Sequence, residues 1–156
     1  MVSDRVRAYH EAAHAVVAIV MGIPIEQTTI LYTNDENGRK IYGHTKYKDL
    51  TDASHEEQAG IISDTVIVAL APIYIVDKIG EGELATLGCL IDYERANAII
   101  ASFTEENDRE KLLTKAKHKA NKEVKKNWEY IRAVAEELLV KKTLTGKEVY
   151  EIMTRV

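Results

Sequence analysis

Residues 9–18 read Tyr-His-Glu-Ala-Ala-His-Ala-Val-Val-Ala, an apolar segment that holds two histidines and one glutamate. On a helix, residues four positions apart lie one turn apart on the same face, so His10 and His14 can point at one ion. Two imidazoles at this spacing suit zinc, and Glu11 between them can act on a water as general base. The stretch therefore predicts a zinc site, with His10 and His14 as ligands and Glu11 as the catalytic base.

The flanking residues place this segment in a helix at about 4–21. Ser3 or Asp4 can cap its start, and Gly22 and Pro24 stop it. The apolar side chains of the segment share one stripe of the helix, and the two histidines lie at the edge of that stripe. A metal site is expected there, against the core but open to a cleft. The alternative is a pair of structural histidines, hydrogen-bonded beside the core without a metal.

Composition limits the classes of function. The chain has 156 residues, of which 46% are hydrophobic and 29% are charged, and it is expected to form one domain, 1–156. Its net charge of -4 gives no reason to expect a nucleic-acid partner. The single cysteine, Cys89, excludes an internal disulfide and a cysteine-rich zinc site, and it fits a reducing cytoplasm. Any metal must therefore be held by histidines and carboxylates.

We expect a soluble, cytoplasmic protein. The N-terminus has no signal-peptide pattern, because His and Glu residues interrupt its apolar stretch. The longest apolar run, 66–76, is about half of the ~20 residues that a membrane span needs. No membrane span is therefore predicted.

The first half of the chain predicts one hairpin and one further helix. Strands are expected at 27–33 and 39–47, joined by a tight turn at Asn37-Gly38. A capping box at Ser54-x-x-Glu57 opens a helix that continues through 61–71, and Pro72 should kink or end it. A loop is expected at 80–82. With the helices expected further along the chain, the fold class is mainly α with one small β-hairpin.

The second half is expected to be helical from Leu90 onward. Asp92 shares an apolar stripe with Ala96, Ile99 and Phe103. An acid in that position is costly unless it is paired or bound to a metal, which makes Asp92 the informative residue of this stripe. Asp64 also lies in apolar sequence.

Two threonines are expected to begin helices near the C-terminus. Thr104 should cap a long lysine-rich helix whose charges form a solvated face, and Thr145-x-x-Glu148 is a second capping box. Between them, an apolar stripe predicts a further core-facing helix with Trp128, Ile131, Val134, Leu138 and Leu139.

Three blocks of the chain resemble the peptidase domain of the FtsH family of zinc metallopeptidases. Residues 9–17 resemble the family's H-E-A-G-H helix, 88–96 resemble the segment that supplies an aspartate ligand, and 138–149 resemble its L-L-x-x-E-T-L-x-G-x-E block. The blocks occur in the family's order and extend over nearly the whole chain. The resemblance implies a helical zinc-protease domain in which His10, His14 and Asp92 hold Zn²⁺ and Glu11 is the base. The residue pattern agrees, because Asp92 is the acid on the apolar stripe, and Asp64 is the competing third ligand. His44 and His55 are then surface residues.

The resemblance also implies an activity, with departures from the family pattern. Ala13 replaces the usual glycine between the ligands, and 71–74 replace a segment of small residues with a glutamate. Little sequence precedes His10, so we expect neither the family's ATPase module nor its membrane anchor. The expected function is an ATP-independent zinc metalloendopeptidase that cleaves peptides or unfolded protein segments. The hairpin could hold such a segment by edge pairing.

Two other functions use the same residues. A non-catalytic interaction or regulatory module would keep the fold and the metal, although it has no need of Glu11. Zinc-dependent hydrolysis of a non-peptide amide would need the same ligands and base. Family members form sixfold rings, so a homo-oligomer is one expectation.

Overall fold

The computed structural model describes residues 2–34, 36–48, 55–80 and 89–156, apart from the side chains of 55–59 and 103. The fold is mainly α-helical with a small antiparallel sheet, which confirms the predicted class. The helical elements are α1 (Asp4–Val20), α2 (His55–Leu70), the 3₁₀ helix η1 (Ala71–Ile75), α3 (Val76–Ile79), α5 (Leu90–Phe103), α6 (Glu106–Lys126), α7 (Trp128–Lys141) and α8 (Gly146–Thr154).

Helix α1 lies at the centre of the molecule and is almost wholly buried between Val6 and Ala18. The Ser3 side chain caps it by accepting a hydrogen bond from the Val6 amide at 3.2 Å. The helix ends before Gly22, which takes a left-handed conformation with φ +82°. The predicted bounds, 4–21, are therefore confirmed to within one residue.

The sheet has three strands, β1 (Ile25–Asn34), β2 (Lys40–Tyr47) and β3 (Thr143–Thr145), in the order β2-β1-β3. Strands β1 and β2 form the predicted hairpin, with Gly38 at φ +76° in its turn. The prediction of a hairpin alone was incomplete, because β3 adds to the other edge of β1. Three residues are too few to show the alternation from which a strand is predicted.

Helix boundaries follow the predicted signals with one exception. Helix α2 ends directly before η1, where Pro72 lies in the first turn, and the Thr145–Glu148 capping box is fully formed. The prediction that Thr104 begins α6 was wrong. Its hydroxyl donates to the carbonyl of Ile100 and so closes α5, while α6 begins after Glu105. Both the Ser54 capping box and most of the 80–82 loop lie outside the described residues.

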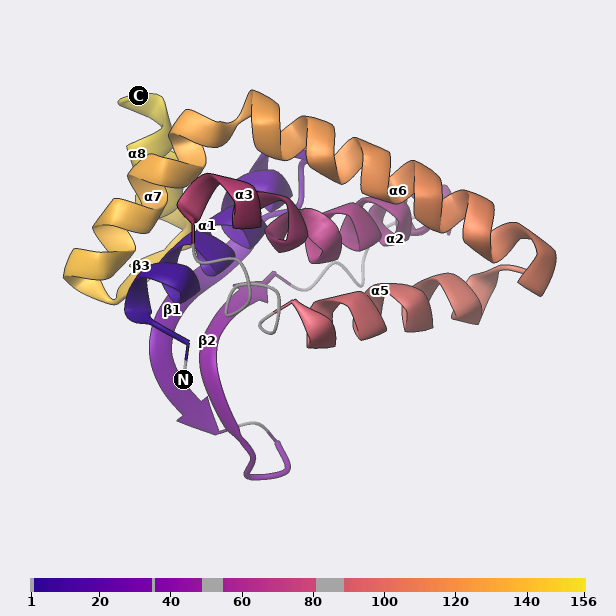
Figure 1. Ribbon diagram of the computed structural model, residues 1–156, viewed down its shortest axis with the longest axis horizontal. Coiled ribbons are helices and arrows are strands. Elements are labelled where there is room, and N and C mark those ends of the chain that lie inside the picture. Colours follow the sequence, from indigo (N-terminus) through magenta and orange to yellow (C-terminus); the bar gives the residue numbers. More distant parts are fainter. Residues whose placement is uncertain (1, 35, 49–54, 81–88) are drawn as a thin grey trace.

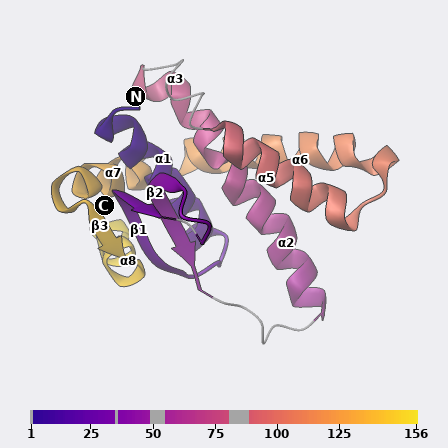
Figure 2. The ribbon, with the colours of Figure 1, turned by 90° about the horizontal axis from the view of Figure 1, so that it is seen from below.

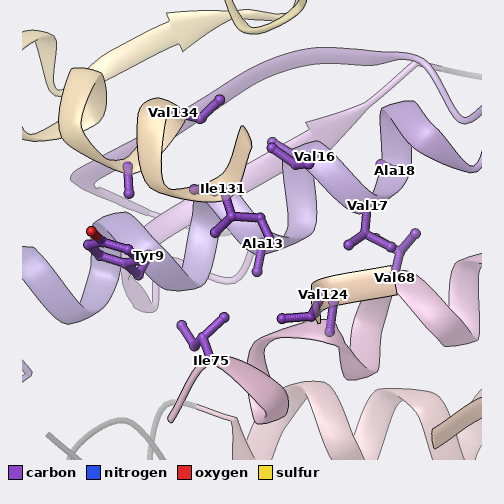
Figure 3. Packing of buried hydrophobic residues seen from close by; sticks show 14 of the residues in the cluster. Tyr9, Ala13, Val16, Val17, Ala18, Val68, Ile75, Val124, Ile131 and Val134 are labelled. Carbon is purple, nitrogen blue, oxygen red and sulfur yellow. The ribbon is translucent and has the colours of Figure 1, made fainter. Parts of the chain in front are cut away.

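The elements form two groups on either side of α1. Helices α2, α5 and α6 lie side by side on one side of it, and the sheet, α7 and α8 lie on the other, as Figures 1 and 2 show from two directions. Side chains of both groups meet α1 in one hydrophobic core (Figure 3). On α1 these include Ala13, Val16 and Val17, and around it Val68, Ile75, Val124, Ile131 and Val134. This core holds α1 in a fixed position between the groups.

One described segment, Gly60–Ile79, is long and apolar enough to cross a membrane by length and composition. It comprises most of α2 together with η1 and α3, and its Leu70 and Ile75 are buried in the core. The core helix of a soluble protein passes the same test. The absence of a membrane span therefore stays a prediction.

Candidate metal centre

The structure brings three predicted ligands together, two from α1 and one from α5. His10 and His14 lie one turn apart on α1, with ring centroids 4.9 Å apart and the rings at 74°. Asp92 lies in the first turn of α5. Its Oδ2 atom is 2.7 Å from His10 Nε2 and 3.2 Å from His14 Nε2. Two helices that are distant in sequence thus meet at a single carboxylate oxygen.

The spacing and chemistry of this His–Asp cluster (His10, His14 and Asp92) fit a zinc ion. Metal–ligand bonds of about 2.0–2.2 Å in a tetrahedral site put neighbouring ligand atoms about 3.3–3.6 Å apart. The three ligand atoms here all lie within 4.8 Å of one another, and the distances to Asp92 Oδ2, 2.7 Å from His10 and 3.2 Å from His14, are those of hydrogen bonds and shorter than that spacing. Two imidazoles and one carboxylate leave a fourth position for water, as in catalytic zinc sites. Small movements of the side chains would admit the ion.

A backbone carbonyl fixes the orientation of one ligand. His14 Nδ1 lies 3.0 Å from the carbonyl oxygen of Val68 on α2. A carbonyl only accepts, so the Nδ1–H of His14 donates to it, and Nε2 is the atom presented to Asp92. Metal-binding histidines are commonly held by this kind of hydrogen bond, which sets both tautomer and ring plane.

Charge in the metal-free cluster is tightly coupled. Burial alone would lower the pKa of His14, but the nearby Asp92 carboxylate outweighs this and raises it to about 9. The Glu11 carboxylate raises the pKa of His14 further. Burial conversely would raise the pKa of Asp92, and the histidine charge and hydrogen bonds hold it well below its usual range. A divalent cation would replace the positive charge that His14 carries in the metal-free protein.

Glu11 lies beside the cluster and against strand β2. Its carboxylate is buried, and Oε2 accepts a hydrogen bond from the Thr45 hydroxyl at 2.7 Å. The Thr45 oxygen in turn lies 2.9 Å from the Thr28 hydroxyl on β1. Gly43 of β2 also lies against Glu11, because a Cβ placed there would be 3.1 Å from Glu11 Oε1. The sheet thus forms one wall of the space around the predicted base.

A tyrosine and a cavity complete the surroundings. Tyr47 follows Thr45 on the inward face of β2, and burial followed by the charges of Glu11 and Asp92 raises its pKa. Its hydroxyl therefore stays protonated.

A mainly apolar cavity of about 430 Å³ lies beside the first turn of α5. It is lined by Ile73, Tyr74, Val76, Asp77, Cys89, Leu90, Tyr93 and Lys117.

Asp64 and His44 do not belong to the cluster. Asp64, the competing third ligand, lies on α2 and is not a member of the ligand group found among the described residues. His44 is exposed, as predicted, and the side chain of His55 lies outside the described part. The roles of His10, His14, Asp92 and Glu11 as ligands and base stay predictions.

Sequence reasoning did not find the residues that hold the site. Thr45, Gly43 and the carbonyl of Val68 contact the predicted ligands or base, and Thr28 bonds to Thr45. Alternation along 39–47 puts residues 43, 45 and 47 on one face of the strand. That pattern contains no sign that this face meets α1, because the packing of a strand on a helix is set by tertiary structure.

In comparisons with known proteins, no protein-family model matches the chain and no curated protein matches it significantly.

Proposed function

We propose that this protein is an ATP-independent zinc metalloendopeptidase that acts on peptides or unfolded protein segments. The observation that carries the proposal is the convergence of His10 Nε2 and His14 Nε2 on one oxygen of Asp92, with the buried Glu11 carboxylate beside them. His10, His14 and Asp92 would hold the ion. A purely structural cluster would not need Glu11 buried next to it.

The ion, when bound, supplies Lewis acidity, which lowers the pKa of a water and polarises a peptide carbonyl. The residues of the chain supply the rest. Val68 and Asp92 orient His14, and the core packing of α1 fixes the spacing of the two histidines. Glu11 takes a proton from the attacking water and returns it to the leaving amine nitrogen.

Two features support a peptide as substrate. Among the described residues β2 pairs only with β1, so its outer edge offers backbone groups to an extended chain. The mainly apolar cavity, which is lined in part by Cys89, Leu90 and Tyr93 around the start of α5, offers room for a side chain of that peptide. Both features suit an unfolded segment, because a folded domain does not present an extended backbone.

Hydrolysis of a quenched peptide and of casein tests the proposal. Zinc-loaded wild-type protein should cleave both, a chelator should abolish cleavage, and Glu11→Gln should keep zinc but lose activity. Glu26→Gln is a matched control, because Glu26 is an exposed glutamate near the start of β1, the central strand of the same sheet. Activity that survives both the chelator and Glu11→Gln refutes the protease. A zinc-loaded wild type without any activity would instead favour the non-catalytic module.

The substrate class has a separate test. We expect unfolded casein to be cleaved much faster than a stably folded protein of similar size. Equal rates on the two substrates would refute the restriction to unfolded segments. The homo-oligomer and the cytoplasmic location stay predictions.

A further inference from the structure

A chain of two buried threonine hydroxyls leads from the sheet to Glu11. Thr28 is fully buried and Thr45 is 5% exposed, so water does not compete for their hydrogen bonds. A carboxylate oxygen only accepts, so Thr45 donates its one proton to Glu11 Oε2. The hydrogen bond between the hydroxyls must then run from Thr28 to Thr45. The donor of each of these two hydrogen bonds is therefore determined.

The backbone of β2 is also shaped around Glu11. Gly43 has φ +88°, a left-handed conformation that side chains rarely adopt. Opposite it, β1 contains two residues, Ile30 and Leu31, between the register pairs Thr29–His44 and Tyr32–Tyr42. This is a β-bulge, a feature that bends a strand and often lies next to a functional site. The bare Gly43 leaves space for Glu11 Oε1, while Thr45 holds Oε2.

We propose that Thr45, supported by Thr28, is a positioning residue that holds the Glu11 carboxylate in one orientation. The hydroxyl fixes Oε2 against the sheet, which leaves Oε1 as the oxygen that exchanges the proton. A glutamate side chain otherwise has several accessible rotamers, and a catalytic group must be held within about 0.5 Å of its productive position. The structural part of this inference stands alone, and its catalytic consequence rests on the proposed protease function.

The same sheet contains a matched control pair. Thr29 and Thr143 bring their hydroxyls to 2.7 Å across β1 and β3. Thr28 and Thr29 are neighbours on β1, so their side chains point to opposite faces of the sheet. The second pair therefore resembles the first in chemistry but does not lead to Glu11. Thr45→Val and Thr143→Val each remove one hydroxyl from a cross-strand pair without changing side-chain volume much.

Infrared spectroscopy of the metal-free protein tests the positioning role without reference to activity. The difference between wild type and Glu11→Gln isolates the carboxylate stretch of Glu11. We expect this band to shift in Thr45→Val, and to keep its position in Thr45→Ser and Thr143→Val. An unchanged band in Thr45→Val, or an equal shift in Thr143→Val, overturns the proposal. Melting curves of all variants identify any that have lost the fold, and Thr28→Val then serves as the second disruption of the same chain.

Peptide kinetics test the catalytic consequence. Thr45→Val should lower kcat by about 10- to 100-fold, less than loss of a whole general base. KM and zinc affinity should stay within about twofold, because the Thr45 hydroxyl bonds Glu11 and Thr28 rather than a predicted ligand, and the substitution leaves the backbone groups of the β2 edge in place. Thr45→Ser should restore kcat. Cleavage by Thr45→Val at the wild-type rate overturns the proposal and leaves the protease intact. A band shift in Thr45→Val together with a zinc-loaded wild type that has no activity supports the positioning role and refutes the protease.

Discussion

Two buried carboxylates, Asp92 and Glu123, have their negative charges compensated by different kinds of partner. Asp92 is 9% exposed and Glu123 is 4% exposed. Glu123 lies near the end of α6 and is satisfied by its own chain segment: Lys119 lies 2.8 Å away and Asn127 donates to its Oε2 at 3.1 Å. Asp92 instead faces two histidines that lie on α1, 82 and 78 residues away.

The difference shows what marks a buried acid as a ligand. The partners of Glu123 lie four residues before and after it, and Lys119 supplies a permanent positive charge that holds the pKa of Glu123 low. Asp92 meets imidazoles, whose charge can be replaced by that of a metal ion. A local, fully paired acid completes a helix end, whereas an acid that joins distant imidazoles is arranged for a cation.

The largest expected contrast is in zinc affinity. Asp92→Ala should weaken zinc binding by more than about 100-fold, the upper limit of what losing an outer-shell partner costs. Glu123→Ala should leave the affinity unchanged, since Glu123 does not belong to the His–Asp cluster. Competition with a chromogenic chelator measures both. Equal affinities in the two variants would remove the distinction between the two acids.

The second contrast is in stability. Glu123→Ala should lower the free energy of unfolding by about 1–3 kcal/mol with or without zinc, because the amide of Asn127 loses a buried acceptor. Asp92→Ala should instead lose the extra stability that zinc gives to wild type, which is about 2.7 kcal/mol at 100 times Kd. Urea unfolding in zinc and in chelator gives all four values. If zinc stabilises Asp92→Ala as much as wild type, Asp92 is not a ligand.

The third contrast is in pH dependence. Zinc must displace the proton that His14 carries in the metal-free protein, whose pKa is raised to about 9. Zinc affinity should therefore rise about tenfold per pH unit between pH 7 and 9, with one proton released from His14, in wild type and in Glu123→Ala alike. Calorimetry in buffers of different ionisation enthalpy counts the protons. Binding of zinc without proton release would contradict the protonated His14.

The same shift predicts how metal-free stability changes with pH. The folded pKa of His14 lies above its ordinary value of 6.5, so the stabilisation from the His14–Asp92 pair is fully present below about pH 6.5. It is lost as the pH rises through about 9. Urea unfolding in chelator across this range should show the decline in wild type and not in His14→Gln.

The smallest expected effect is that of Lys119→Met. The Lys119 side chain is 43% exposed, so solvent screens its pairing with Glu123. We expect a loss below about 1 kcal/mol, less than that of Glu123→Ala, because Asn127 still satisfies the acid. Melting curves of the two variants compare them directly. A larger loss for Lys119→Met would mean that Glu123 depends on its charge partner as strongly as Asp92 depends on the histidines.

The parts of the fold that local chemistry determines were predictable. The cap at Ser3 and the left-handed Gly22 fix the ends of α1. The position of Asp92 on an apolar stripe indicated that this acid needs a partner. The prediction that Thr104 caps α6 was wrong because a threonine can either cap the next helix or bond back to the previous turn. Here its hydroxyl donates to the carbonyl of Ile100. Sequence pattern does not separate these two outcomes.

The supporting contacts of the site could not be predicted in the same way. The hydrogen bond from Thr45 to Glu11 joins residues 34 positions apart, and that from His14 to Val68 joins residues 54 apart. Both depend on how a strand and a second helix pack on α1. Asp92 and Asp64 looked alike in sequence, and only the tertiary position of α5, which packs on α2 and α6 and brings Asp92 to the histidines of α1, distinguishes them.

Anomalous scattering at the zinc edge, from crystals of the protein purified and grown with zinc, tests the central claim most directly. We predict one strong peak about 2.0–2.2 Å from His10 Nε2, His14 Nε2 and a carboxylate oxygen of Asp92. If these crystals show no peak there, and Asp92 still lies hydrogen-bonded to both histidines, the cluster is structural and the metal centre is refuted.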